Sequence, residues 1–253
     1  MIRASLAAYR DITKVLFFRT DISPFLVHLT RDWDSTHLAK DNLIDILTSC
    51  SLRYTRQISD AKYGVATETV STTNRRYFSA MSFTETPLGE IHNLMDIAGR
   101  YCDLKPYGLV FLKDRLKEKG VSPVIYINNM RGDQDDSVRA LCSLIDTHPN
   151  EAARILPFVA VFGKLLSPLG GTPRTKDLDF TWEREWRYAC GESFNFNFDH
   201  EDVFLGLCPH EEIRESEERF SWLKFIDPYR NIKWYSEKVL EVKETLGLKH
   251  SIV

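Results

Sequence analysis

The chain has 253 residues, of which 43% are hydrophobic, 27% charged and 12% aromatic. Its 33 Lys and Arg residues and 36 Asp and Glu residues leave a net charge of −3. This balance excludes a strongly basic nucleic-acid coat, although it leaves room for a local basic groove. An apolar content this high with so little net charge also excludes a disordered chain, and the length suits one large domain or two small ones.

The N-terminal segment and the cysteines predict a cytoplasmic protein. Asp11, Lys14 and Arg19 interrupt the first apolar patch, so we expect no signal peptide. No stretch has the roughly 18 uncharged apolar residues that a membrane helix needs. The five cysteines are odd in number and form no C-x-x-C pair, which favours reduced thiols over a disulfide framework or a zinc ribbon.

Apolar runs and turn residues predict an α+β fold, because strands and helices alternate without a regular β-α-β order. Strands are expected at residues 25–30, 78–85, 107–112, 123–128, 180–190 and 203–207. Helices are expected at residues 5–19, from Asp41 or Asn42 to 47, 89–101, 114–119, twice within 134–166 with 155–166 buried, and at 211–220 and 236–246. Residues 65–76 and 170–177 are expected to be loops. The glycine motifs of Rossmann and P-loop nucleotide sites do not occur.

His28, in the apolar run F-L-V-H-L-T, is the first candidate for a functional residue. An imidazole on a strand can offer one nitrogen as donor or acceptor to a ligand hydroxyl. Taken alone, the residue is more typical of a core histidine whose hydrogen bonds are made within the protein.

The segment W-E-R-E-W-R-Y at 182–188 is the second candidate. In a strand, Glu183, Glu185 and Arg187 would share one face, and the residues between them would share the other. Two carboxylates about 6.5–7 Å apart, or two strand rises, can divide the work at one site: one stabilises a developing cation while the other positions a nucleophile. A cross-strand ion-pair ladder on a solvated face explains the same pattern equally well.

The third candidate is S-F-T-E-T-P at 82–87, together with Tyr107. Small hydroxyls at the end of a strand can hold a carboxylate in its working rotamer, and a nearby aromatic ring can stack on a planar ligand. An ordinary edge strand with outward Ser and Thr is the alternative, and it is favoured when the motif is considered alone.

In chain order, these words resemble the bacterial abortive-infection proteins of the AbiGi type. The resemblance rests on H-L-T, N-L-x-x-I-L, S-F-T-E-T-P-L, Y-G-L-V-F-x-K, P-V-I-Y and E-x-E-W-R-Y, and it covers roughly residues 25–190. An uncharacterised family with the same E-W-R ending is also similar. AbiGi itself is sometimes assigned as the antitoxin of its pair, a role that needs no catalysis.

The same order is similar to the ADP-ribosyltransferase fold, and H-L-T with N-L-x-x-I-L is like the opening of the DNA-modifying toxin DarT. This resemblance implies a split mixed sheet with flanking helices in one domain, 1–253, with core motifs in 25–190 and a helical C-terminal extension, 209–253. It also implies NAD as the substrate. The acceptor would be a macromolecule, with RNA or DNA favoured over protein.

The resemblance to the ADP-ribosyltransferases also implies roles for individual residues. Glu185 would stabilise the oxocarbenium-like transition state, and Glu183 would orient the acceptor. The residues implied to bind NAD are His28, Leu29, Thr30, Ser82, Phe83, Thr84 and Tyr107. The second motif departs from a clean S-T-S, and its Glu85 competes for the catalytic role. A pair of tyrosines at the family's usual spacing is missing.

Three weaker patterns were weighed. A basic stretch can track phosphates, although a solvated helix face is the simpler interpretation; it comprises Arg100, Lys105, Lys113, Arg115, Lys117 and Lys119. Residues 199–218 are acidic and can form an interaction surface. Cys208 and His210 with His200 lack the spacing of metal ligands, so no metal site is expected.

The leading expectation is therefore an ADP-ribosyltransferase of antiphage defence or of a toxin–antitoxin system. The alternative is a non-catalytic antitoxin or phage-sensing protein that binds a partner protein. A metal-dependent nuclease is a third and weaker hypothesis.

Overall fold

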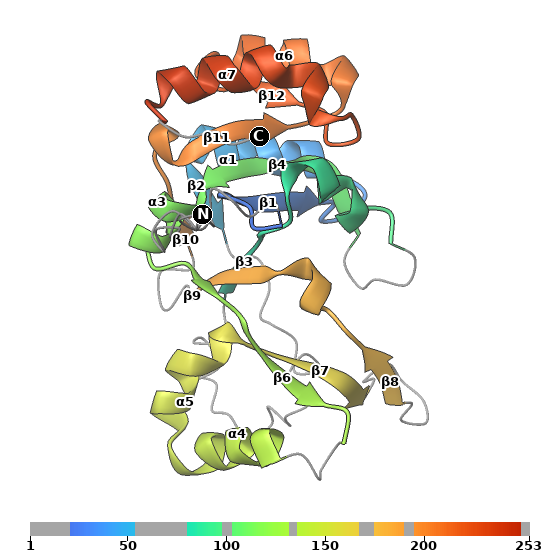
Figure 1. Ribbon diagram of the computed structural model, residues 1–253, viewed down its shortest axis with the longest axis vertical. Helices are drawn as coiled ribbons and strands as arrows, with labels where there is room; N and C mark the ends of the chain where they lie inside the picture. The colour runs from blue at the N-terminus through green and yellow to red at the C-terminus, as the bar shows by residue number, and fades with distance from the viewer. Residues whose placement is uncertain are drawn as a thin grey trace, which may run out of the picture.

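The computed structural model describes residues 21–53, 80–97, 103–131, 136–166, 175–189 and 195–248. In this part of the chain, a seven-stranded sheet and a three-stranded sheet carry several helices (Figure 1). This confirms the expected α+β class. The helix expected at 5–19 and the loop expected at 65–76 lie outside the described residues. Among the described helices, none has the length and apolar character needed to cross a bilayer.

The main sheet has the strand order β12-β11-β4-β1-β3-β9-β5. Its strands are β1 (Phe25–Arg31), β3 (Ala80–Thr84), β4 (Leu104–Leu112), β5 (Ser122–Pro123), β9 (Glu185–Ala189), β11 (Val203–Leu207) and β12 (Phe225–Ile226). Neighbours are antiparallel except β11 and β12, which are parallel. The central strands β1 and β11 are buried along nearly their whole length, and β4 is buried from Gly108 to Phe111, as expected for a sheet covered on both faces.

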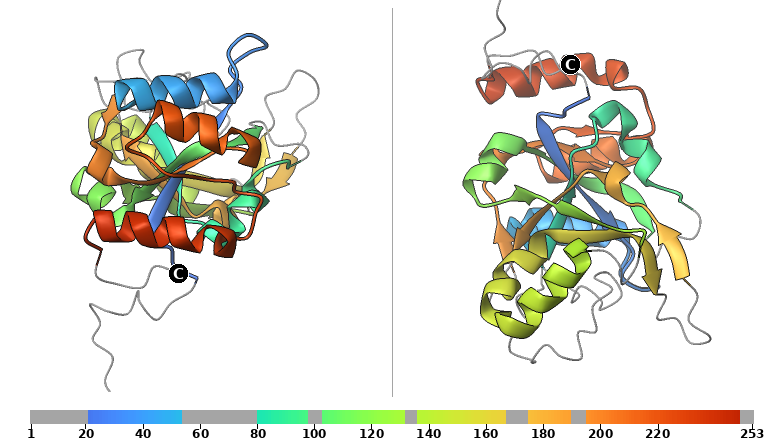
Figure 2. Two further views of the ribbon diagram at one scale, coloured as in Figure 1. Left: turned by 90° about the horizontal axis from the view of Figure 1, so that it is seen from above. Right: turned by 60° about the horizontal axis from the view of Figure 1, so that its bottom comes forward.

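Helices lie on both faces of the main sheet. Viewed from above, α1 (Ala39–Ser49) and α6 (Ile213–Arg219) lie on one side, and α7 (Ser236–Thr245) lies on the other (Figure 2, left). The short α3 (Lys113–Glu118) follows β4 directly, and Gly120 closes it with a positive φ of 91°. A separate pair of short strands, β2 (Ser51–Arg53) and β10 (Asn195–Asn197), brings Phe196 against the core rings of Phe83 and Phe111.

The small sheet, β6-β7-β8, forms the lower end of the molecule in Figure 1. It consists of β6 (Ile125–Asn129), β7 (Val159–Leu166) and β8 (Thr175–Leu178). Two helices, α4 (Asp136–Thr147) and α5 (Pro149–Ile155), connect the parallel strands β6 and β7, and they lie beside the sheet (Figure 2, right). This arrangement is a β-α-α-β crossover, which parallel pairing requires.

Several expected elements differ from those observed. The segment 155–166 is not a buried helix: after a 3-10 turn at Leu156–Phe158 (η7), it forms β7. Its run V-A-V-F is short and partly β-branched, and Gly163, with a φ of 109°, lies in strand pairing rather than in a helix. The helix expected over 89–101 is a 3-10 helix, Leu88–Leu94 (η5), and Asp96 has a left-handed φ of 58° just after it. The loop expected at 170–177 ends in β8.

Other expected elements are confirmed, with shifted ends. The strand expected at 123–128 is divided between β5 and β6, so that it joins both sheets. The expected C-terminal helical segment contains α6 and α7 and also supplies β12, the edge strand of the main sheet. Four further 3-10 segments are η8 (Thr181–Glu183), η9 (His200–Asp202), η10 (His210–Glu212) and η11 (Ile232–Tyr235).

Candidate functional site

The structure brings the three candidate motifs onto adjacent strands. His28 lies on β1, Ser82 and Thr84 lie on β3, and Glu185 begins β9. These strands are neighbours in the order β1-β3-β9, and Tyr107 lies on β4 at the other side of β1. The order of the three motifs along the chain is therefore also the order of their strands in the sheet.

The strand registers nevertheless place His28 and Glu185 on opposite faces of the main sheet. Val27 is paired with Thr84, and Thr84 is paired with Glu185, so these three side chains point to one face. His28 follows Val27 and therefore points to the other face, because side chains alternate along a strand. The centroid of its ring lies 5.8 Å from that of Phe83. Phe83 precedes Thr84 on β3 and therefore points to the same face as His28.

The carboxylate of Glu185 is held by two side chains of its own face. Ser82 Oγ donates to Oε1 at 2.6 Å. Arg187 forms a bidentate pair, with Nε donating to Oε1 at 2.8 Å and Nη2 donating to Oε2 at 2.7 Å. Glu185 is 6% exposed and Arg187 is 0% exposed. This is a buried ion pair of a geometry that fixes both partners.

The same pair attaches the small sheet to the main sheet. Arg187 Nη1 donates to the carbonyls of Pro157 and Val159, both at 2.9 Å, where β7 begins. The backbone N–H of Glu185 donates to Tyr126 Oη at 2.8 Å, from β6. Burial raises the pKa of Tyr126, so its hydroxyl keeps its proton at neutral pH. Arg187 Nη1 and the backbone N–H of Glu185 thus join the main sheet to the small sheet.

Glu183 does not share a strand face with Glu185, contrary to the expectation from alternation. It ends the 3-10 turn η8, and Arg184, with a left-handed φ of 45°, separates it from β9. The carbonyl of Glu183 accepts a hydrogen bond from Thr84 Oγ1 at 2.6 Å. Thr84 Oγ1 also lies 2.8 Å from the hydroxyl of Thr86, so the S-F-T motif ties the end of β3 to the start of β9.

The H-L-T motif is bonded within the protein. His28 Nδ1 lies 2.9 Å from the carbonyl oxygen of Ser82, and burial lowers the pKa of its half-buried ring. Leu29 is part of the apolar core. Thr30 Oγ1 lies 2.9 Å from the carbonyl oxygen of Ala39 and 3.2 Å from that of Tyr107, which fixes β1 to α1 and β4.

Tyr107 points to η10 and α1. Its hydroxyl donates to Glu212 Oε1 at 2.9 Å, and Lys40 pairs with the other oxygen of Glu212 at 3.1 Å. Burial and this carboxylate raise the pKa of Tyr107. The cavity beside these groups has about 20 Å³, roughly the space of one water molecule, so it does not admit a planar ring.

Glu85, the competing carboxylate, forms a second buried ion pair. Lys113 Nζ donates to Glu85 Oε1 at 2.7 Å and to the carbonyl of Ser23 at 2.5 Å. Trp186 Nε1 donates to Glu85 Oε2 at 2.7 Å. These contacts join β3, β9, the start of α3 and the segment before β1. Lys113 was expected in a basic surface stretch, but it is buried here.

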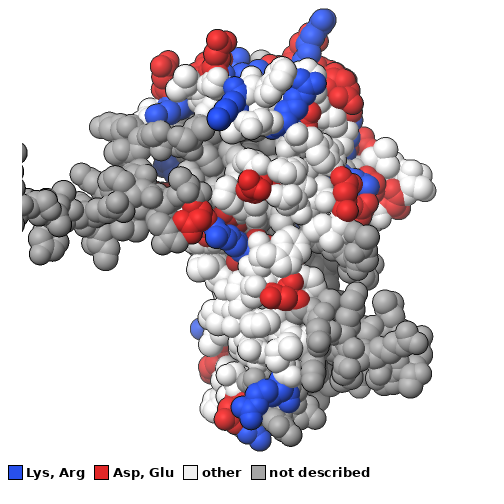
Figure 3. Space-filling model, turned by 45° about the vertical axis from the view of Figure 1, so that its right-hand side comes forward, with Lys and Arg blue, Asp and Glu red and all other residues white. Residues whose placement is uncertain are grey.

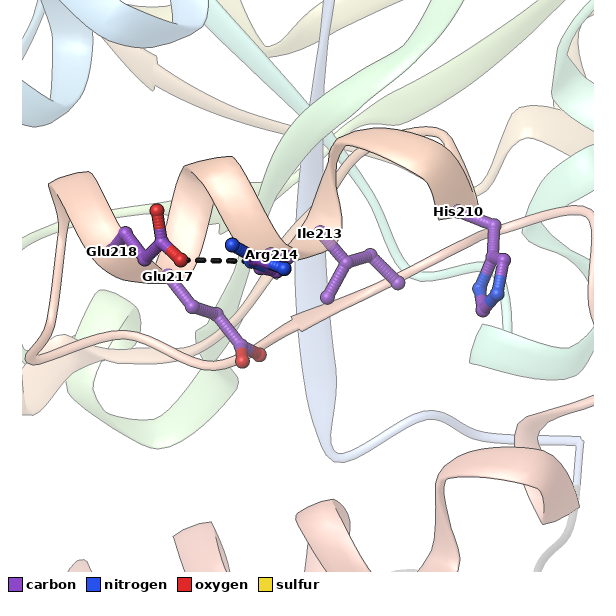
Figure 4. Close-up of a pocket in the computed structure, with 5 residues that line it drawn as sticks. All are labelled: His210, Ile213, Arg214, Glu217 and Glu218. Carbon is purple, nitrogen blue, oxygen red and sulfur yellow. Dashed lines mark hydrogen bonds and ion pairs between the residues drawn. The ribbon is translucent and has the colours of Figure 1, made fainter.

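A larger pocket lies elsewhere, along α6. It has a volume of about 440 Å³ and is lined by His210, Ile213, Arg214, Glu217 and Glu218 (Figure 4). In Figure 4 the Arg214–Glu218 pair, at 2.9 Å, lies along one side of the helix. The residues expected to bind NAD lie outside this lining.

The described residues contain no group of three or more His, Cys, Asp or Glu residues placed to hold a metal ion. Cys208 is buried, which raises the pKa of its thiol to about 12. His200 stacks on Trp222, with ring centroids 3.7 Å apart. The contacts of Cys208 and His200 are therefore those of residues that stabilise the fold.

The residues that sequence analysis missed are Lys113, Tyr126 and the inward role of Arg187. A weak signal for Arg187 was its place two residues after Glu185, on the same face of an expected strand. That pattern predicted an ion pair, but a solvated one. The carbonyl groups that accept from it, at the start of β7, lie 28 and 30 residues earlier in the chain.

Comparison with known proteins gives one family. The family model "Putative abortive phage resistance protein AbiGi, antitoxin" matches residues 53–225, more than half of the chain. No curated protein and no solved structure matches the chain.

Proposed function

Because the chain belongs to the AbiGi family, we propose that it is the antitoxin of an abortive-infection system and acts by binding a cognate toxin protein. The family match over residues 53–225 is the observation that carries this proposal. A protein of this kind needs a stable binding surface rather than a cleft with reactive groups.

The bonding of the motif residues supports a binding role. Glu185 is occupied by Ser82 and Arg187, and Tyr107 is occupied by Glu212. The carboxylates of Glu185 and Glu212 are each paired with a cation, and the pair formed by Glu185 is buried. Groups of this kind hold a fold together and are costly to release for chemistry.

The test is expression of the product of the neighbouring gene with and without this chain. We expect growth arrest by the neighbouring product alone, rescue by co-expression, and recovery of both chains as one complex in gel filtration. Cells that co-express the Glu185→Ala variant should still be rescued from growth arrest, in proportion to the amount of folded variant. Growth that is unaffected by the neighbouring product, or rescue without a complex, would contradict direct antitoxin binding.

ADP-ribosyl transfer from NAD to RNA, DNA or protein is a second candidate for the function. The observation that favours it is the neighbouring position of the H-L-T, S-F-T and E-W-R words on β1, β3 and β9. His28 and Glu185 point to opposite faces of those strands, so they do not meet around one ligand as they stand. Catalysis would require Glu185 to leave Arg187 and the second sheet.

This second candidate has a direct assay. Nicotinamide release from NAD is measured in the presence of RNA, DNA and cell protein, with calorimetric titration of NAD as an independent readout. The transferase hypothesis expects NAD binding and nicotinamide release that Glu185→Gln abolishes, while Glu218→Gln, on the exposed side of α6, leaves both unchanged. The absence of both signals for the folded wild-type protein would rule it out.

A further inference from the structure

Exposed aromatic side chains lie near the C-terminal end of β1, which we call its exit end. Trp33 and Tyr229 are each 50% exposed, and Trp234 is 75% exposed. Trp33 follows β1, Tyr229 lies in the turn after β12, and Trp234 lies in η11, before α7. Large rings at this level of exposure leave much apolar surface in water, and Trp and Tyr are the residues most enriched at the energetic centres of protein interfaces.

A chain of contacts joins these aromatic residues into one surface. Arg31 is paired with Leu104 across β1 and β4, which places Asp32 beside Asp103. Asp103 binds Lys105 at 2.5 Å, and Asp32 and Asp96 lie close enough to Lys105 to raise its pKa further. We call the surface formed by residues 31–34, 96, 103–105 and 227–234 the exit-end surface.

Residues 227–235 contribute to the same surface through a contact with Asp96. The hydroxyl of Tyr229 donates to Asp96 Oδ2 at 2.5 Å. Arg230 lies over the ring of Trp234, 5.5 Å from its centroid, and pairs with Asp227 at 3.6 Å. Tyr229 is therefore held by a polar contact at the same end of the main sheet as Trp33, and Arg230 joins Trp234 to the segment that carries Tyr229.

The loop that presents Trp33 is held in one conformation. Asp32 Oδ1 accepts from the N–H of Ala39 at 2.8 Å, and Asp34 Oδ1 accepts from the N–H groups of Thr36 and His37 at 2.7 and 2.9 Å. The N–H of Trp33 donates to the carbonyl of His37 at 2.9 Å. An exposed ring on a fixed backbone loses little conformational entropy when a partner covers it.

The charge of the exit-end surface selects the kind of partner. Five carboxylates lie here with four cations, an excess of one negative charge: Asp32, Asp34, Asp96, Asp103 and Asp227 with Arg31, Lys105, Arg230 and Lys233. Lys105 and Arg230 are already paired with Asp103 and Asp227. Figure 3, which turns the right-hand side of Figure 1 forward, shows a largely uncharged surface with scattered acidic side chains, some of them beside Lys or Arg. A surface with excess negative charge repels nucleic-acid phosphates and attracts arginine and lysine.

We propose that the exit-end surface is where this chain binds its toxin, and that the toxin presents a basic face whose arginine and lysine side chains meet Asp32, Asp34 and Asp96 while its apolar groups cover Trp33, Tyr229 and Trp234. This inference rests on the proposed antitoxin function and names the surface that performs it. The rings supply the buried apolar centre, and the carboxylates supply orientation and association rate.

The test measures the dissociation constant between this chain and the product of the neighbouring gene by biolayer interferometry. Trp33→Ala and Tyr229→Ala should each weaken binding by about tenfold or more, the loss typical of a central aromatic anchor. Trp182→Ala is the matched control, because Trp182 is 45% exposed and lies in η8, away from the exit-end surface; it should leave the constant unchanged. Thermal melting confirms that each variant is folded.

A second pair of variants tests the charge. Asp103→Lys places a second cation beside Lys105, next to Asp32 and Asp96, so that it opposes the basic side chains that those carboxylates would attract. It should weaken binding and flatten its dependence on salt between 50 and 300 mM, whereas Glu218→Lys, at an exposed position of α6, should do neither. A complex that is equally tight in Trp33→Ala, Tyr229→Ala and Asp103→Lys overturns this inference and leaves the antitoxin function standing. Absence of any complex with the wild-type chain overturns both. Nucleic acid in place of the toxin, detected as binding of RNA or DNA that Asp103→Lys strengthens, overturns the assignment of a basic protein partner.

Discussion

Arg187 and Glu185 form a bidentate ion pair between alternate residues of one strand, and the same guanidinium donates to the backbone of a second sheet. The pair lies where β9 begins its pairing with β3 and where β7 begins. The position suggested from sequence for a catalytic carboxylate is therefore also the junction of the two sheets.

Removal of one partner of this junction should strongly destabilise the protein. In Glu185→Gln, the fully buried Arg187 loses its counter-charge, and we expect the free energy of unfolding to fall by about 3–5 kcal/mol. Urea denaturation followed by circular dichroism measures the loss. Arg214→Ala breaks an exposed ion pair on α6 and should cost less than about 1 kcal/mol. Equal losses in the two variants would contradict the structural role.

The pair between Lys113 and Glu85 should behave in the same way, with a specific rescue. Lys113→Met leaves the partly buried Glu85 without its cation, and we expect a loss of about 2–3 kcal/mol. The double variant Lys113→Met/Glu85→Gln removes the stranded charge and keeps an acceptor for the indole N–H of Trp186, so it should recover part of the loss. A double variant as unstable as the sum of the two single variants would show that the residues do not act as a pair.

Much of the main sheet was predictable because its strands are short apolar runs with turn residues at their ends. The runs at β1 and β11 read as buried strands, and both are. The run at 155–166 has the same character but was expected to be a helix, since a short apolar run shows no period to separate the two. Its strand partner, β6, is more than thirty residues earlier, and only that pairing decides the outcome.

The candidate site could be predicted as an order of strands but not as a geometry. The motifs containing His28, Ser82 and Glu185, which follow one another along the chain, lie on neighbouring strands. Which face each side chain occupies depends on the register, and a shift of one residue reverses it. The turn at Arg184, which removes Glu183 from the strand, has no signature in W-E-R-E-W-R, because an arginine with positive φ is uncommon.

Gly163 should be essential to the small sheet. It has a φ of 109°, and a Cβ there would lie 2.7 Å from the backbone nitrogen of Met130, at the end of β6. Gly163→Ala should cost at least about 2 kcal/mol and increase hydrogen exchange in β6 and β7 before the main sheet. Gly89→Ala is the control, because a Cβ there meets nothing within 4 Å, and its effect should stay within about 0.5 kcal/mol. Similar exchange in the two variants would argue against the clash.

His28 should make the folded state less stable in mildly acidic solution. Burial lowers the pKa of its ring from the ordinary value of 6.5, so the unfolded chain binds a proton at a pH where the folded chain does not. The contribution of the neutral ring is fully present above about pH 6.5 and is lost as the pH falls towards the folded pKa.

Urea midpoints at pH 7.5, 6.5 and 5.5 should therefore decrease for the wild type. The decrease should be smaller in His28→Gln, whose side chain can still bond to the carbonyl of Ser82 but cannot titrate. His92→Gln, at an exposed position of η5, is the control and should follow the wild type. Parallel curves for the wild type and His28→Gln would show that the buried ring is not the group that titrates.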